Sequence, residues 1–476
     1  MTAAPAPSSR THAAVAIALC ALSAVVLRWA GRAPDVEGFD SVGFLLAVDH
    51  YDLAARTPHF PGYPLYLLAA RAFRALGASP VDALCWPGIL GAAGLVLCAA
   101  ATAARLHSPR AAVGAALLAL VLPGLQLAGS RPLTEGLGAA LLSAALLLAV
   151  DAWRTPAPPH PLWRTFALGL LLGALWGVRP AWVAAPAGLA APFLVARRRE
   201  AAAIFGGALL ACVGWLGALV LLTGPAELAE AARKVLVGHF TSWGGTALTD
   251  GLGASRVDRL GWCVLAWGLG LPWHAADGVA PAAAVAGGLL VLAAVTALPP
   301  VPHRAPLVGA AGAAALYLLV GANPENPRHA VQLLVPLVPL LAVGAARWRW
   351  LAPALAVALG LGTVPLAAEQ ASAAAPAVEL ARMLATLDPP PRFYGFTTTR
   401  TVALRAPAVT SVLVDHLDEV ARAERGAAPG MVLFESRVPG KSQRRHKFIP
   451  VATFQRNHRI DPAGASITLY LYRGPQ

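Results

Sequence analysis

The chain has 476 residues, of which 57% are hydrophobic and only 13% charged, and its mean hydropathy is +0.61. Because a soluble domain carries about 25% charged residues, this composition excludes an ordinary soluble protein. Segments almost free of charge recur along the first three quarters of the chain, each close to the roughly 20 residues that cross a bilayer. The sequence therefore predicts a polytopic membrane protein.

The formal net charge is +13, which by itself would suggest a nucleic-acid partner. The positions of the basic residues argue against one, because they gather in short loops between apolar segments. These loops contain Arg105, Arg110, Arg154, Arg164, the run RRRE at 197–200, Arg347 and Arg349. Short basic loops mark the cytoplasmic side of a membrane protein. We therefore interpret the basicity as a topology signal and expect membrane lipids, not nucleic acid, as surroundings.

With the N-terminus inside, eleven spans place all of these loops in the cytoplasm and the C-terminus outside. We treat the first as a retained span and not as a cleaved signal peptide. The predicted spans are 13–30, 83–104, 111–128, 133–152, 164–179, 180–196, 201–223, 278–298, 304–321, 329–346 and 350–367. Residues 61–77 and 259–274 are also apolar, but counting either as a span would invert every later loop. We predict juxtamembrane or re-entrant elements for both.

From about residue 370 the composition changes to short β-branched and aromatic segments bounded by Pro, Gly and Asp. The segments RFYGFTTT, VTSVLV, GMVLFES and SITLYLYR are predicted strands, and VDHLDEVARAERG is a predicted helix. This part contains no Walker loop and no GxGxxG turn. We predict a transmembrane domain over residues 1–368, followed by a small extracytoplasmic α/β domain over residues 369–476.

The first predicted outer loop is unusually polar for so apolar a chain. Residues 41–56 have the pattern of a surface helix that would place Phe44 and its apolar neighbours in lipid. Asp40 precedes this helix, and from local sequence alone it suits an N-cap. Asp35 and Glu37, just upstream, are predicted to be solvated loop charges.

The pair Asp40-Ser41 and the later run HFPGYPL, residues 59–65, resemble a signature of the GT-C superfamily of integral-membrane glycosyltransferases. This superfamily includes the protein O-mannosyltransferases and the lipid A aminoarabinose transferases, and its signature reads D-S-G-E…H-P-P-G-Y-P-L. The chain departs from it at Phe44, near the glutamate position, and at Phe60, which replaces a proline. Three later segments also resemble parts of these enzymes. SRPLTEGLG is similar to their outer loop between the third and fourth spans, and GVRPAW to a polar break between short spans. NPENPRHAVQLLVPLVPLLAVG is similar to the opening of one of their spans.

The resemblance implies transfer of a sugar from a polyprenyl-phosphate-linked donor to an acceptor hydroxyl at the outer membrane face, with inversion. It gives Asp40 the position of the catalytic base, since a hydroxyl needs a base near neutral pH. Arginine meets phosphate oxygens bidentately and suits the leaving group. The substrate-binding candidates are His59, Tyr63, Arg131, Glu135, Arg179, His239, Arg328 and His329.

Each candidate also has a structural alternative. Arg179 would otherwise extend its side chain to the interface, and Arg131 would cap the next helix and pair with Glu135. His59 would otherwise be a turn residue, and Arg328 with His329 would be an ordinary flanking loop. His239, with the nearby Trp243, would otherwise anchor the chain at the interface.

The acceptor class is left open as lipid, glycan or protein. The five cysteines all lie in apolar segments without a metal or disulfide pattern, so no metal site is predicted. Some members of the superfamily use a divalent cation at first-loop acidic residues. The Ala, Arg, Gly and Pro bias indicates a bacterium with a GC-rich genome, and hence its inner membrane. The competing prediction is a transporter or lipid flippase, although the internal repeats typical of transporters are not visible.

Overall fold

The structure is a computed structural model, and it describes most of the chain. The described residues are 7–154, 161–242, 245–271, 288, 291–292, 294–295, 303–324, 326–396, 398–414, 432–435, 448–461 and 464–472. Most of the predicted span 278–298 and the predicted helix over VDHLDEVARAERG lie outside them, as does Trp243.

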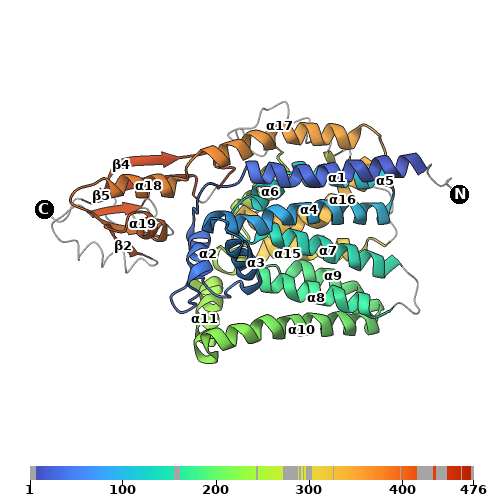
Figure 1. Cartoon of the computed structure of the whole chain (residues 1–476), viewed down its shortest axis with the longest axis horizontal. Helices are drawn as coiled ribbons and strands as arrows, with labels where there is room; N and C mark the ends of the chain where they lie inside the picture. Colours follow the sequence, from blue (N-terminus) through green and yellow to red (C-terminus); the bar gives the residue numbers. More distant parts are fainter. Residues whose placement is uncertain are drawn as a thin grey trace.

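A helical bundle forms most of the molecule, with its helices along the long axis (Figure 1). Six described stretches are long and apolar enough to cross a membrane: Arg10–Ala30, Pro80–Leu106, Glu135–Arg154, Arg198–Thr223, Pro327–Ala345 and Leu351–Ala385. They contain helices α1 (Pro7–Ala30), α4 (Pro80–Leu106), α7 (Glu135–Arg154), α10 (Arg198–Thr223), η3 (Pro327–Ala330), α16 (Val331–Ala345), α17 (Leu351–Ser372) and α18 (Pro376–Ala385).

A seventh candidate span is broken at Pro123, where α5 (Pro109–Val121) and α6 (Pro123–Gly129) meet at 59°. Proline explains the break because it lacks a backbone donor and clashes with the preceding turn. Three shorter apolar helices complete the described bundle: α8 (Trp163–Val178), α9 (Ala184–Ala196) and α15 (Ala305–Val320). The ten predicted spans other than 278–298 each coincide with one of these helices or with the α5–α6 pair.

Small residues bring the helices close together. A side chain on Gly136 of α7 would place its Cβ 2.6 Å from the Cα of Gly88 in α4 and 2.9 Å from the Cα of Gly129 in α6. Small residues at such contacts are the usual way in which membrane helices approach each other. The three glycines therefore fix α4, α6 and α7 against one another.

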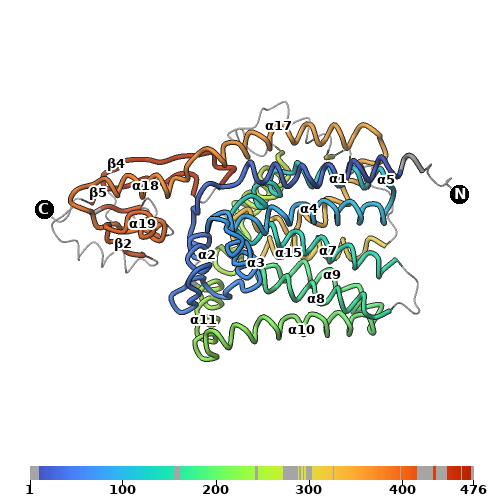
Figure 2. Tube along the Cα trace, viewed as in Figure 1, coloured from blue at the N-terminus to red at the C-terminus, as the bar shows by residue number. Residues whose placement is uncertain are grey.

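Two short helices of the first loop lie across one end of the bundle, α2 (Phe39–Asp49) and α3 (Pro64–Ala75) (Figure 2). The helix predicted over residues 41–56 ends early, at Asp49. Near its end, Arg71 of α3 donates to the carbonyl oxygens of Ala47 and Val48 at 2.9 Å. The prediction that its apolar face lies in lipid is wrong. Phe44 and Ala47 are fully buried against protein, because α3 and its neighbours cover this face.

Further short helices join the spans. They are α11 (Pro225–Val237), η1 (Gly238–Ser242), α12 (Ala247–Asp250), α13 (Ala254–Gly261) and the π-helix η2 (Trp262–Gly268). We predicted that the apolar stretches 61–77 and 259–274 do not span. Their described residues contain α3 in the first case and the end of α13 with η2 in the second. The described helices of both stretches are shorter than a span.

After α17 the chain folds into a small mixed sheet beyond the end of the bundle that carries α2, which we call the sheet end (Figure 1). Its strands are β1 (Arg392–Gly395), β2 (Thr410–Leu413), β3 (Val432–Glu435), β4 (Phe448–Gln455) and β5 (Ser466–Tyr472), in the order β2-β1-β3-β5-β4. β1 is parallel to β2 and β3, whereas β5 is antiparallel to β3 and β4. Helices α18 and α19 (Thr399–Arg405) pack on it through Leu380, Leu384 and Val402.

Candidate active site

Asp40 lies in the first turn of α2, at the sheet end of the bundle. It is not the N-cap, as its local sequence suggested: Gly38 has that position, and the Ser41 hydroxyl oxygen accepts the amides of Glu37 and Gly38 at 3.1 Å. The carboxylate of Asp40 is thereby free for a tertiary partner. That partner is Arg328 of η3, whose Nη2 donates to Oδ2 of Asp40 at 2.5 Å.

Two side chains of the HFPGYPL turn complete the surroundings of Asp40. His59 Nδ1 lies 3.6 Å from Asp40 Oδ1, and His59 Nε2 forms a hydrogen bond with the Tyr63 hydroxyl at 2.8 Å. Burial alone would raise the pKa of Asp40, but Arg328, His59 and Arg179 together hold that pKa well below its usual range. Burial lowers the pKa of His59, and nearby Asp40 only partly offsets this. The site therefore contains an ionised carboxylate beside an imidazole whose pKa is lowered by burial.

A buried carboxylate, Glu135 at the start of α7, binds the arginines of two other segments. Its Oε1 lies 3.0 Å from Arg179 Nη2 and 3.4 Å from Arg328 Nε. Arg179, at the end of α8, also donates to the Thr134 hydroxyl at 2.8 Å. Because its charge is neutralised inside the protein, Arg179 has no need to extend to the interface. Asp40, Glu135, Arg179 and Arg328 thus form one network at the sheet end, in which Arg328 bridges the two acids.

His329 follows Arg328 and lies within electrostatic range of Arg179 and Asp40, so it belongs to the same region. His239 lies earlier in the chain, in η1, where its Nε2 is 3.1 Å from the carbonyl oxygen of Gly321. This contact places His239 beside the segment that leads into η3, although not in contact with Asp40.

The structural alternative for Arg131, pairing with Glu135, is wrong. Its Nη2 lies 2.7 Å from Glu37 Oε2 and 3.2 Å from Asp461 Oδ2. Arg456, which follows β4, also pairs with Glu37. Asp35 pairs with Arg405 of α19. The prediction that Asp35 and Glu37 are solvated loop charges is therefore wrong, because arginines from the C-terminal part cover them.

These C-terminal partners were missed in the sequence. Arg405, Arg456 and Asp461 are ordinary charged residues near the ends of short elements, and no spacing signal connects them with the first loop. Arg400 of α19 was missed for the same reason. Its guanidinium carbon lies 4.0 Å from the ring centroid of Phe39, next to Asp40.

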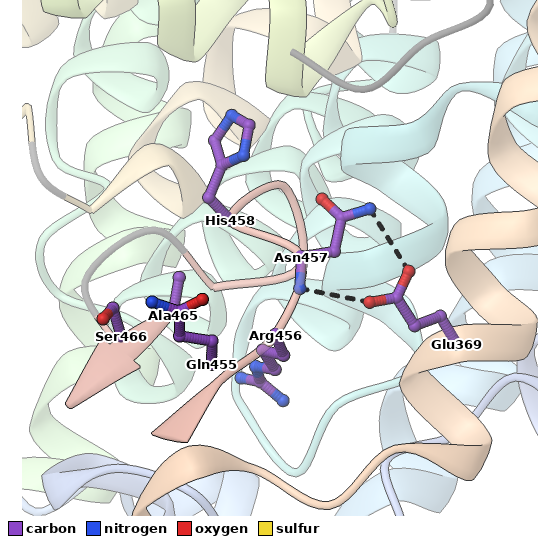
Figure 3. A pocket seen from close by; sticks show the side chains of 7 residues that line it. All are labelled: Glu369, Gln455, Arg456, Asn457, His458, Ala465 and Ser466. Atoms are coloured by element: carbon purple, nitrogen blue, oxygen red, sulfur yellow. Dashed lines mark hydrogen bonds between the residues drawn. The ribbon is translucent and has the colours of Figure 1, made fainter. Parts of the chain in front are cut away.

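A cavity of about 490 Å³ opens nearby, between α17 and the β4–β5 hairpin (Figure 3). It is lined by Glu369, Gln455, Arg456, Asn457, His458, Ala465 and Ser466. Glu369 accepts from the backbone and side-chain nitrogens of Asn457 at 3.1 and 3.2 Å. The segment after β4 is therefore fixed to the last helix of the bundle.

The acidic residues of the first loop do not suit a divalent cation in this arrangement. Asp35, Glu37 and Asp40 each have one carboxylate oxygen paired with an arginine, with which a cation would have to compete. Within the described part of the chain, no group of three His, Cys, Asp or Glu side chains has the arrangement of a metal site.

Comparison with known proteins identifies the fold. No protein-family model and no curated protein sequence matches the chain. Among solved structures, ArnT from Cupriavidus metallidurans bound to undecaprenyl phosphate has a TM-score of 0.58 at 14% identity, over 97% of this chain and 99% of that one. The Archaeoglobus fulgidus oligosaccharyltransferase tethered to an acceptor peptide has a TM-score of 0.53 at 13% identity, over 98% and 74%.

A third similar structure is the mycobacterial arabinofuranosyltransferase AftD, with a TM-score of 0.50 at 14% identity, over 97% of this chain and 40% of that one. All three are membrane glycosyltransferases of the GT-C superfamily. The chain therefore has the GT-C fold, as the first-loop motif indicated, and it is an integral membrane protein with a small C-terminal sheet region.

Proposed function

We propose that the protein is a glycosyltransferase that moves a sugar from a polyprenyl-phosphate-linked donor to an acceptor hydroxyl, with inversion at the anomeric carbon. The observation that carries the proposal is the contact of Asp40 with Arg328 at one end of a membrane bundle. It joins a potential base and a potential phosphate ligand in one site. The GT-C fold supports the proposal, since ArnT of the same fold was solved with undecaprenyl phosphate.

Arg328 and Arg179 are the proposed partners of the donor phosphate. As the glycosidic bond breaks, the departing phosphate gains negative charge, and donors already in place stabilise that charge without reorganisation. Both guanidinium groups are held by Glu135. Their positions are thus fixed before substrate binds.

Asp40 is the proposed base, and its contact with Arg328 bears directly on that role. A carboxylate whose pKa is held low is a weak base, because base strength follows pKa. Donor phosphate that binds Arg328 would weaken the contact with Asp40 and raise the pKa of Asp40. The carboxylate then accepts the proton of the acceptor hydroxyl as the new C–O bond forms. The bond from the sugar to phosphate breaks, and polyprenyl phosphate leaves with the electron pair.

The site is proposed to face outward from a bacterial inner membrane, together with the C-terminal sheet. The helix ends that carry the basic loops lie at the opposite end of the bundle, beside the N-terminus (Figure 1). Basic loops mark the cytoplasmic side. The acceptor would then approach from outside, as lipid, glycan or protein.

The test uses purified protein in detergent with a panel of radiolabelled polyprenyl-phosphate sugars. Wild type is compared with Asp40→Asn and with the control Asp49→Asn, an exposed carboxylate at the end of the same helix. We expect donor consumption by wild type and control, and a loss of about 100-fold or more in Asp40→Asn. Equal consumption by all three would remove Asp40 as base. Movement of intact donor across liposomes without consumption would instead identify a flippase.

A further inference from the structure

Four charged side chains, Glu37, Arg131, Arg456 and Asp461, form a second cluster beside the proposed site, here called the Glu37 cluster. Arg131 and Arg456 both contact Oε2 of Glu37, and both contact Oδ2 of Asp461, at 3.2 and 3.4 Å. Arg131 Nη1 also donates to the carbonyl oxygen of Ile460 at 3.1 Å. Two carboxylates and two guanidinium groups thus neutralise one another.

The Glu37 cluster and the Asp40 network share two chain segments. Glu37 lies three residues before Asp40, and Arg131 lies four residues before Glu135. Each segment therefore has one residue in the Glu37 cluster and another in the network around Asp40. A shift of the Glu37 side chain would be transmitted through a few backbone bonds to the first turn of α2.

The ion pair between Arg456 of the C-terminal part and Glu37 of the first loop is buried. The side chain of Arg456 is 2% exposed and that of Glu37 is 6% exposed. Burial alone would raise the pKa of Glu37, but Arg131 and Arg456 outweigh it and hold that pKa below its usual value. A buried charge that loses its partner is strongly unfavourable. Glu37 therefore depends on Arg456 as well as on Arg131.

The segment that carries Arg456 is itself held in place by the membrane helices. Asn457 is bound by Glu369 of α17, as Figure 3 shows. The ring of His458 lies 5.5 Å from that of Trp262 in η2. The segment from 456 to 461 thus connects the sheet with α17, with η2 and with the first loop, and Arg456 is its contact with the first loop.

We propose that Arg456 is a positioning residue, which acts through Glu37 to hold the first turn of α2 and thereby sets Asp40 against Arg328. The inference rests on the proposed function. It makes the C-terminal sheet a part of the active-site support. Small displacements of a reacting group have large effects on rate, of the order of 100-fold for about 1 Å. Arg456 does not touch the reacting atoms, so its loss would lower turnover more than donor binding.

The experiment compares full-length wild type with Arg456→Ala, Arg456→Lys and the control Arg392→Ala, an exposed arginine of the same sheet. Amide hydrogen exchange over residues 36–42 is measured by mass spectrometry on all four proteins without substrate. In parallel, kcat and KM are measured with whichever donor the wild type consumes. The exchange measurement needs no activity, so it remains informative if the proposed function fails.

We expect exchange over residues 36–42 to become about tenfold faster in Arg456→Ala and to stay unchanged in Arg392→Ala. The kcat value should fall about tenfold or more, with KM within about twofold of wild type, and Arg456→Lys should recover part of both effects because it restores the charge. Wild-type exchange over residues 36–42 in Arg456→Ala would overturn the proposal, and so would an unchanged kcat. If Arg456→Ala does not fold, Arg456→Lys decides: slower turnover with faster exchange supports the proposal, and wild-type values contradict it.

Discussion

Arg328 and Asp40 form a direct ion pair although 288 residues separate them in the sequence. The pair joins the first loop to the start of the late span that begins at η3. The pair keeps Asp40 ionised and occupies the guanidinium that we propose for the donor phosphate. The donor phosphate must therefore compete with Asp40 for Arg328, so we expect substitution of this arginine to have a large effect.

Two substitutions of Arg328 should distinguish the effect of its positive charge from the effect of its planar geometry. Arg328→Ala is expected to weaken binding of polyprenyl phosphate more than tenfold, since it removes a charge-assisted bidentate donor. Arg328→Lys should retain part of the binding but lose about 10- to 100-fold in turnover, because lysine offers a point charge without the planar fork. Calorimetric titration with a short-chain polyprenyl phosphate measures the first effect and donor consumption the second. The control is Arg233→Ala, an exposed arginine of α11; an unchanged affinity in Arg328→Ala would contradict the assignment.

Glu135 should be important for stability as well as for the site. Glu135→Gln leaves Arg179 and Arg328 without their shared carboxylate in a buried place. Removing one partner of a buried ion pair costs about 3–5 kcal/mol, and we expect an effect on the order of 3 kcal/mol in the free energy of unfolding in mild detergent. Glu230→Gln is the matched control, because its partners lie on the exposed surface of α11, where water screens such pairs and they contribute little to stability. Equal effects of the two substitutions would argue against a buried network.

The position of α2 against protein, not lipid, can be tested within the helix. Phe44→Ala removes a fully buried ring that contacts Tyr63 and Tyr66. It should lower the free energy of unfolding by about 3–5 kcal/mol. Leu46→Ala, on the exposed side of α2, should have a much smaller effect. Similar small effects at both positions would favour the lipid-facing helix that the sequence pattern suggested.

The Glu37 cluster predicts a loss of stability in acid. The folded-state pKa values of Glu37 and Asp461 lie below their ordinary values, because Arg131 and Arg456 outweigh the effect of burial. The stabilisation is therefore fully present above the unfolded-state pKa of about 4. It is lost as the pH falls through the lowered folded-state values.

The melting temperature in detergent, followed from pH 7 to pH 3, measures this loss. The difference between wild type and Glu37→Gln isolates the cluster from other titrating groups. That difference should be constant above about pH 5 and should shrink below about pH 4. A difference that stays constant over the whole range would mean that Glu37 does not titrate with folding.

Much of the bundle was predictable, because hydropathy and basic loops act locally along the chain. The long helices appear where the apolar runs predicted them, and the first-loop motif led to the correct fold class. The break of the predicted span 111–128 at Pro123 was not predicted. The number of eleven spans remains a prediction, since most of residues 278–298 lie outside the described part.

The site was predictable only in part. Asp40, His59, Tyr63 and Arg328 belong to two recognisable motifs, and the structure brings them together. The partners of Glu37 and Arg131 were not predictable, because ion pairs between residues 94 to 419 positions apart leave no local pattern. The surroundings of helix α2 were predicted wrongly for a related reason: an apolar face has the same sequence pattern whether lipid or protein covers it. Strand β4 was missed, although the four predicted strand segments each contain a described strand.

The contact of Gly88, Gly129 and Gly136 has a consequence for motion during turnover. Because their backbones touch without intervening side chains, α4, α6 and α7 have no soft layer between them near the start of α7. Glu135 adjoins Gly136 and so stands beside this close backbone contact, whereas Asp40 stands on a short loop helix. Opening for substrate would then move the carboxylate of Asp40 away from a stationary Glu135, and the distance between these two acids would report the step.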